Sequence, residues 1–183
     1  SDGAVWINHL QERHAKNQRG LKLPAARVLG KVCKLPEELP GSFAKCKLVG
    51  GHHEIRYEEA AGVGYLHFDF HNGAMSTEQC QRLRRAFQLA TARPTQAIAL
   101  VGGEDFHSNG IHLGAIEAAR DPVAESWRNI NAINDLVLEV LTCTSHLTVS
   151  AVQGNAGAGG AVFALACDVV AARSGRIFNL HYK

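Results

Sequence analysis

The sequence predicts an α/β fold built around a mainly parallel β-sheet. Short apolar runs of strand length alternate with segments of helical periodicity: AIALV at 97–101, LTVSAV at 147–152 and DVVAAR at 168–173. Strands that are apolar on both faces are typical of a parallel sheet covered by helices. The order strand, helix, strand, helix, strand implies right-handed crossovers in that sheet. RIFNL at 176–180 predicts a short fourth strand.

A β-hairpin is predicted ahead of these runs. HEIRYEE at 53–59 and VGYLHFDF at 63–70 both alternate apolar and polar residues, and AAG at 60–62 lies between them. Alternation with a short glycine-containing connection is typical of two antiparallel strands. The expected sheet is therefore mixed, with an antiparallel hairpin beside parallel strands.

The first helix is predicted over residues 76–91. Ser76 and Gln79 have the spacing of a capping box, and Pro94 lies just beyond the end. One apolar stripe follows the helical period and comprises Cys80, Leu83, Phe87 and Ala90.

A longer helix is predicted from Asp121 to about Thr142. Asp121 serves as its cap and Pro122 as its first-turn proline. We expect one buried stripe, comprising Val123, Trp127, Ile130, Ile133, Val137, Val140 and Leu141. Two shorter helices are expected in HLGAIEAA at 112–119 and in GGAVFALAC at 159–167.

Composition excludes several classes of protein. Hydrophobic residues make up 46% and charged residues 20% of 183 residues, as in soluble globular proteins. A net charge of +2 favours neither a nucleic-acid partner nor a membrane surface. The five cysteines are widely spaced and form no CxxC pair, so we expect reduced thiols in a cytoplasmic protein and no metal site.

Residues 1–50 differ from the rest of the chain. They contain three of the five prolines, Pro24, Pro36 and Pro40, and each proline disfavours helix before it. We interpret 1–50 as an irregular N-terminal tail or linker and 51–183 as the main domain. The alternative is that the first segment is an edge of that domain.

Two glycine-rich loops follow buried strands. VGGEDFHSNG at 101–110 follows the strand at 97–101, and GNAGAGG at 154–160 follows the strand at 147–152. Parallel strands end at one edge of a sheet, where open α/β sheets bind ligands, so we expect both loops there. Glycine also lets a substrate atom approach backbone N–H groups at a helix start.

Several interpretations of GNAGAGG compete. A dinucleotide fingerprint needs GxGxxG and a phosphate loop needs GK[ST], and neither spacing is present. A further interpretation is that the glycines only allow close packing of helix and strand and bind no ligand. Because two separate loops that donate one N–H each can hold an acyl oxyanion, the pairing of the loops favours an oxyanion hole.

Longer motifs resemble a known family. AVQGNAGAGGAVFALACDVVAA at 151–172 is similar to the signature of the crotonase (enoyl-CoA hydratase/isomerase) superfamily, and EDFHSNGIHL at 104–113 resembles its first oxyanion loop. The resemblance covers roughly 54–183. It implies a crotonase-like (ClpP/crotonase) spiral of ββα units, truncated at its C-terminus and preceded by the irregular tail.

Within this superfamily, other segments look like the crotonase-like domain of the [NiFe]-hydrogenase maturation factors called HypX or HoxX. These segments are FHNGAMSTEQCQRL, HSNGIHLGAIEAA and DPVAESWRNINAINDL. The tail resembles the end of their formyltransferase-like part. The resemblance implies that formyl-tetrahydrofolate serves that upstream part, and that hydrogenase maturation proteins are partners.

The resemblance also implies site residues. The backbone N–H groups of Ile111 and Gly159 would be the oxyanion donors, and Tyr182 would be a third catalytic group. Residues expected to contact coenzyme A or its acyl group are Ala74, Ser108, Asn109, Gly110 and Gly160. For Ser108 and Asn109, the alternative is that they satisfy backbone groups of their own loop.

Three positions depart from the hydratase pattern. One hydratase glutamate falls at Val162 and the second near Tyr182, and the first glycine of the triplet is Ala158. Adding water to a double bond needs a positioned acid and base, and valine can be neither. For Tyr182, the alternative is a packed aromatic at a strand end.

These departures lead to three function hypotheses. The resemblance implies a lyase that decomposes formyl-CoA to carbon monoxide and CoA. The alternatives are a conventional enoyl-CoA hydratase or isomerase, and a CoA-binding scaffold without catalysis.

Overall fold

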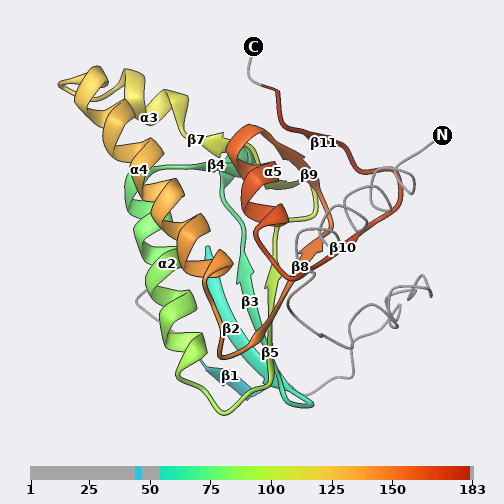
Figure 1. The fold of residues 1–183 in the computed structure, drawn as a ribbon. Coiled ribbons are helices and arrows are strands. Elements are labelled where there is room, and N and C mark those ends of the chain that lie inside the picture. The colour runs from blue at the N-terminus through green and yellow to red at the C-terminus, as the bar shows by residue number, and fades with distance from the viewer. Residues whose placement is uncertain (1–43, 47–53, 182–183) are drawn as a thin grey trace. The chain divides into compact units, whose positions relative to one another are not determined.

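A six-stranded mixed sheet organises the computed structural model, which describes residues 44–46 and 54–181 (Figure 1). The strand order is β1-β2-β3-β5-β8-β10. The strands are β1 (Ala44–Cys46), β2 (Ile55–Ala60), β3 (Val63–Phe68), β5 (Ala97–Val101), β8 (Leu147–Val152) and β10 (Val169–Ala172). The first three are antiparallel, and β3, β5, β8 and β10 run parallel. The predicted α/β class and mainly parallel sheet are confirmed.

The predicted hairpin is formed by β2 and β3, whose register pairs Ile55 with Phe68 and Ala60 with Val63. Ala61 and Gly62 connect the strands with φ of 50° and 78°. Two successive residues with positive φ are the signature of a type I′ turn, whose twist matches that of the strands.

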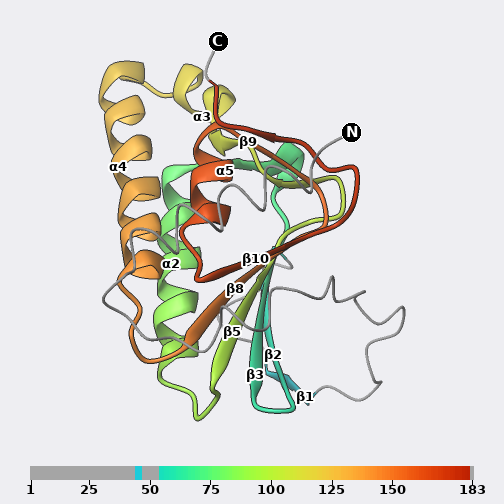
Figure 2. The same ribbon diagram turned by 45° about the vertical axis from the view of Figure 1, so that its right-hand side comes forward.

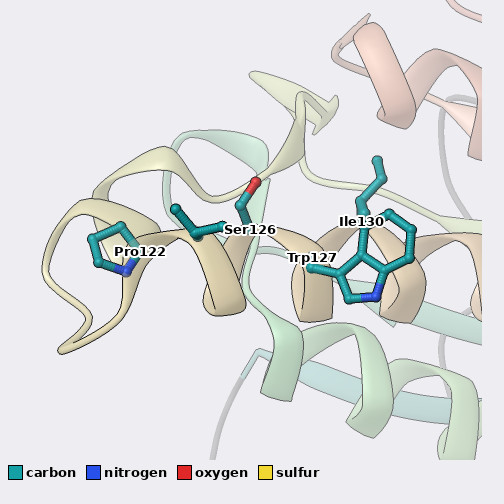
Figure 3. Close-up of a pocket in the computed structure, with 5 residues that line it drawn as sticks. Pro122, Ser126, Trp127 and Ile130 are labelled. Atoms are coloured by element: carbon teal, nitrogen blue, oxygen red, sulfur yellow. The ribbon is translucent and has the colours of Figure 1, made fainter.

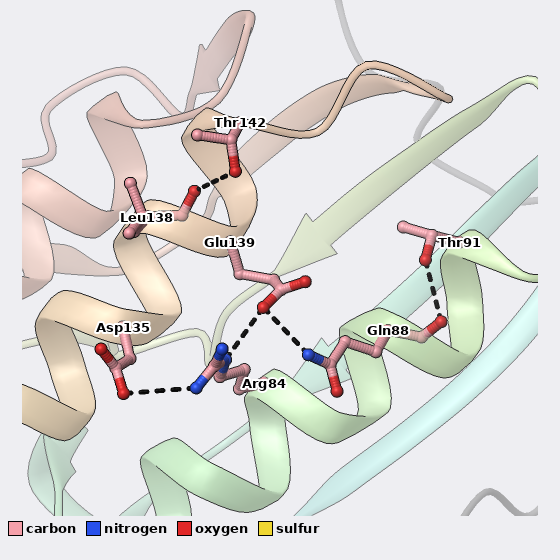
Figure 4. Close-up of polar contacts among 7 residues, drawn as sticks. All are labelled: Arg84, Gln88, Thr91, Asp135, Leu138, Glu139 and Thr142. Carbon is pink, nitrogen blue, oxygen red and sulfur yellow. Dashed lines mark hydrogen bonds and ion pairs between the residues drawn. The ribbon is translucent and has the colours of Figure 1, made fainter.

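Helices α2 (Thr77–Thr91) and α4 (Pro122–Leu141) lie side by side against the sheet (Figures 1 and 2). The predicted capping box of α2 is present, and its whole predicted stripe is buried. Arg84 of α2 contacts Asp135 and Glu139 of α4 at 3.2 and 2.9 Å (Figure 4). Gln88 also donates to Glu139, at 2.9 Å. These polar contacts border the core between the two helices.

The single stripe predicted for α4 is wrong in part. Val123, Trp127 and Leu141 are 81%, 71% and 60% exposed. The buried face of α4 comprises Asn129, Ala132, Ile133, Leu136 and Val140. The helix carries apolar side chains on two faces, and packing against α2 and the sheet buries one of them.

Short strands form two smaller sheets, which the sequence pattern did not predict. One has the order β11-β9-β6, and the other pairs β4 with β7. Their bounds are β4 (Ala74–Met75), β6 (Phe106–Ser108), β7 (Gly110–Ile111), β9 (Asn155–Gly157) and β11 (Phe178–Asn179). The fourth predicted strand is thus β11, and it joins the smaller sheet rather than the large one.

The described residues also form three short helical elements. They are η2 (His71–Gly73), α3 (Leu113–Glu117) and α5 (Ala158–Leu165). Because α3 follows β7 and α5 follows β9, each glycine loop leads into a helix, as predicted.

Candidate functional site

The two glycine loops converge beyond the carboxyl ends of β5 and β8. These strands are parallel neighbours, with Val101 opposite Ala151 at the end of their pairing. The loops then pair with each other through β6 and β9, where Phe106 lies opposite Asn155. The predicted meeting of the loops at one sheet edge is confirmed.

Backbone contacts bring the two predicted oxyanion segments together. A Cβ atom on Gly110 would lie 2.9 Å from the Gly159 nitrogen, and one on Gly160 would collide with the Ser108 carbonyl oxygen. Gly110 also has a φ of +84°, in the region that glycine tolerates best. Glycine at these positions therefore allows the segment of Ile111 to lie directly against the start of α5.

Two polar side chains of the first loop form hydrogen bonds with backbone groups of the protein. Ser108 is fully buried, and its Oγ donates to the Gly73 carbonyl at 3.2 Å and accepts from the Gly110 N–H at 3.1 Å. The Asn109 side chain donates to the Asn72 carbonyl at 2.7 Å. Both side chains satisfy loop backbone groups, which was the alternative to a contact with the acyl group. Their contact with a ligand stays a prediction.

Ala74 lies beside the first loop. It is the parallel partner of Gly110, and Met75 is the partner of Ile111. Four of the predicted site residues, Ala74, Gly110, Ile111 and Gly159, thus belong to adjoining segments. The fold brings them together from three separate parts of the chain.

Comparison with known proteins defines the family. Residues 58–182 match the profile of the family described as enoyl-CoA hydratase/isomerase. The chain belongs to the enoyl-CoA hydratase/isomerase family. This family belongs to the crotonase superfamily that the glycine motifs resemble.

The chain is also a homologue of HypX and HoxX. It is 47% identical over 182 residues to hydrogenase maturation factor HoxX of Bradyrhizobium diazoefficiens, covering all of this chain and 30% of that protein. HypX from Aquifex aeolicus, crystallised with tetrahydrofolic acid, is 50% identical with a TM-score of 0.72. That match covers 88% of this chain and 28% of HypX. The chain therefore spans less than a third of the length of these relatives.

A more distant member shares the fold alone. Enoyl-CoA hydratase from Bacillus halodurans is 22% identical with a TM-score of 0.56, covering 64% of this chain and 49% of that one. The crotonase-like fold class is thus confirmed.

The second loop carries backbone strain where the family motif has glycine. Ala158 adopts a φ of 47°, in the left-handed region. For a residue with a Cβ this conformation costs roughly 1–2 kcal/mol. Strain of this kind is often retained at functional sites because the surroundings hold the backbone in place. Ala158 directly precedes Gly159, so its conformation helps to set the direction of the second predicted donor.

The side chain at the hydratase glutamate position is accessible but apolar. Val162 lies on α5 and is 45% exposed. It offers no group that could exchange a proton with water or substrate. Tyr182, the other position of interest, lies outside the described residues. His112 directly precedes α3, and its Nδ1 caps this helix by accepting from the Ala115 N–H at 3.0 Å.

His107 is a buried neutral residue beneath the first loop. Its ring lies edge-on to Phe68, with centroids 5.1 Å apart, and stacks on Phe163 at 6.1 Å. Within the described part of the chain, Nδ1 has no hydrogen-bond partner, and Nε2 lies 3.4 Å from Ser150 Oγ. Burial lowers the pKa of His107 to about 4. It is therefore uncharged at neutral pH and serves as part of the core.

Sequence reasoning missed Asn129, which contacts β4 and the residue that follows β7. Its side chain accepts from the His112 N–H and donates to the Met75 carbonyl, both at 2.9 Å. The signal available was a polar residue on the same helical face as Ala132 and Ile133. The predicted apolar stripe was placed through Trp127 and Ile130, on a face of the helix that does not include Asn129.

A shallow groove of about 520 Å³ runs along the outer face of α4 (Figure 3). Pro122, Val123, Ser126, Trp127 and Ile130 line it. None of the predicted site residues contributes to it, so it is separate from the junction of the glycine loops. In the described part of the chain, no group of three or more His, Cys, Asp or Glu side chains is placed to hold a metal ion.

Proposed function

We propose that the chain is the thioester-processing part of a HypX/HoxX-like hydrogenase maturation factor and decomposes formyl-CoA to carbon monoxide and CoA. The observation that carries the proposal is the close approach of the two loops, where a Cβ on Gly110 would lie 2.9 Å from the Gly159 nitrogen, combined with valine at position 162. The first feature supports an oxyanion hole, and the second argues against water addition.

The reaction breaks the C–H and C–S bonds of the formyl group and forms the S–H bond of CoA. The N–H groups of Ile111 and Gly159 would polarise the formyl C=O, and each such donor contributes about 2.7–4 kcal/mol in acyl transfer. A base takes the formyl proton, and the C–S electron pair leaves with sulfur. The carbon keeps the former C–H electron pair and departs as carbon monoxide. The thiolate then takes up a proton to give CoA.

Two side-chain positions support this chemistry over hydration. Val162 supplies no carboxylate to activate water, which would protect a reactive formyl thioester from hydrolysis. Tyr182 is proposed to hydrogen-bond at the acyl group. Ala74 and Asn109 are proposed to lie along the bound CoA.

The wider context is proposed from the relatives. The tetrahydrofolic acid in the structure of HypX from Aquifex aeolicus supports formyl-tetrahydrofolate as the formyl source in another part of such proteins. Hydrogenase maturation proteins are the proposed partners, and the cytoplasm is the proposed location.

None of the helices in the described part of the chain has the length and hydrophobicity that crossing a membrane requires.

Carbon monoxide release from formyl-CoA tests the proposal. Gly159→Pro removes the donor N–H and is expected to lower the rate at least about 100-fold, whereas Gly159→Ala keeps the N–H and is the matched control. Tyr182→Phe is expected to lower the rate less. An unchanged yield in both Gly159→Pro and Tyr182→Phe would contradict the site.

Crotonyl-CoA distinguishes the alternatives. Efficient loss of its enoyl absorbance would favour a conventional hydratase, contrary to the expectation from Val162. Tight binding of CoA with no turnover of either thioester would favour a scaffold.

A further inference from the structure

We propose that Asn129 is a positioning residue that sets the place of the Ile111 backbone N–H. The proposal rests on the proposed function for the role of that N–H as a donor. The contacts themselves belong to the fold and can be tested separately.

Asn129 holds the chain on two sides of Ile111. Its Oδ1 accepts from the N–H of His112, the next residue in the chain, at 2.9 Å. Its Nδ2 donates to the carbonyl of Met75, the strand partner of Ile111, also at 2.9 Å. One carboxamide thus ties α4 to β4 and to the residue that follows β7, and the β4–β7 pair lies beside the N-terminal half of α4 (Figure 1).

Burial makes these two bonds specific. Asn129 is 1% exposed, so water does not offer its amide an easy replacement for either partner. A buried amide that loses a partner is destabilised. The bonds therefore define one relative placement of the helix and the two strands, which an apolar side chain of similar size would not do.

We call the two bonds of Asn129, to Met75 and to His112, the Asn129 bracket. Neighbouring contacts hold the same segments in place. On the other side of Ile111, Ser108 Oγ accepts from the Gly110 N–H at 3.1 Å. One turn before Asn129, Glu125 accepts from the Thr77 hydroxyl at 2.6 Å. Thr77 begins α2 just after β4, so α4 is fastened both to β4 and to the start of α2.

This bracket matters for catalysis because an oxyanion donor must be placed within about 0.5 Å of its productive position. A displaced donor weakens the transition state more than the bound substrate. Loosening the bracket should therefore lower kcat and leave KM for formyl-CoA nearly unchanged.

Asn129→Asp is the first test, because it keeps the shape and the acceptor and turns the donor toward Met75 into a carboxylate oxygen. We expect kcat for carbon monoxide release to fall about 10- to 100-fold, with KM within about threefold. In Asn129→Leu, which also removes the acceptor of the His112 N–H, we expect hydrogen exchange at the His112 amide to accelerate at least about tenfold. Asn131→Asp is the control, because among the described residues the Asn131 side chain bonds within α4, to the Trp127 carbonyl at 2.6 Å. It should change each value by less than about twofold.

The outcomes separate the two proposals. Unchanged exchange at His112 in Asn129→Leu overturns the positioning role, as does accelerated exchange with an unchanged kcat. Accelerated exchange in a protein whose wild type releases no carbon monoxide leaves the bracket standing and refutes the proposed function. If Asn129→Asp does not fold, the uncharged Asn129→Leu carries the same measurements. Failure of both to fold refutes a positioning role in favour of a purely structural one.

Discussion

The two glycine loops meet at one edge of the sheet but are held there by different means. In the first loop, side chains fasten the backbone: Ser108 bonds Gly73 and Gly110, and Asn129 bonds His112. In the second loop, glycine residues without side chains allow the backbone to pack directly against the first loop. A Cβ on Gly154 or Gly160 would collide with the backbone of the first loop.

This difference teaches how each loop should respond to change. Hydrogen bonds can be removed one at a time, so substitutions in the first loop should lower stability in small steps. A steric collision moves the whole backbone, so perturbation of the second loop should be abrupt. Four substitutions test this contrast, from the largest expected effect to the smallest.

Gly160→Ala should have the largest effect. Its Cβ would press on the carbonyl of Ser108, which cannot rotate away. We expect the free energy of unfolding to fall by about 3 kcal/mol, at the upper end for overpacking. Gly114→Ala is the control, because its nearest neighbour would be the His112 ring at 3.5 Å. Denaturant unfolding measures both, and equal stability of Gly160→Ala and wild type would refute the steric account.

His107 should make the first loop sensitive to acid. Its pKa is about 4 in the folded chain and about 6.5 when unfolded. Between these values the unfolded chain binds a proton that the folded chain does not. Stability is therefore full above pH 6.5 and lost as the pH falls toward 4, by up to about 3 kcal/mol.

His107→Leu should remove most of this slope in urea unfolding measured from pH 7 to pH 4. Burial and the nearby Arg56 also lower the pKa of His67, so part of the slope should remain. A His107→Leu profile that parallels wild type would show that His107 is not the source.

Ser108→Ala tests the fastening of the first loop. It leaves the Gly110 N–H without its partner in a buried place and removes one bond to the Gly73 carbonyl. We expect a loss of about 2 kcal/mol in thermal or urea unfolding. Ser174→Ala, at an exposed position, should change stability by less than about 0.5 kcal/mol. If Ser108→Ala lowers the free energy of unfolding as much as Gly160→Ala does, the proposed difference between the loops is refuted.

Ala158→Gly should have the smallest effect, with the opposite sign. Glycine relieves the strain of a φ of 47° but loses more conformational entropy on folding, so the net gain should be up to about 1 kcal/mol. Ala161→Gly lies in the same helix at 0% exposure and should instead lower stability by about 1 kcal/mol or more. A loss in Ala158→Gly would mean that the second loop is not strained there.

Local features were predictable in detail. The capping box at Ser76 and the buried stripe of α2 depend on residues three or four positions apart, so the sequence pattern predicted both. The hairpin and the strands β5, β8 and β10 followed from short-range patterns as well. Strands of two residues such as β4 and β7 carry too little pattern to predict, because they exist only where a partner pairs with them.

The sequence by itself determined which segments form the sheet, that two glycine loops leave it at one edge, and that valine stands where hydratases have a glutamate. Only the tertiary structure decided which face of α4 is buried, that His107 is neutral beneath the loop, and that Asn129 joins α4 to Met75 and His112. The reason is physical: helical and strand periods are set by neighbouring residues, whereas burial and hydrogen-bond partners depend on residues that the chain brings together from far apart.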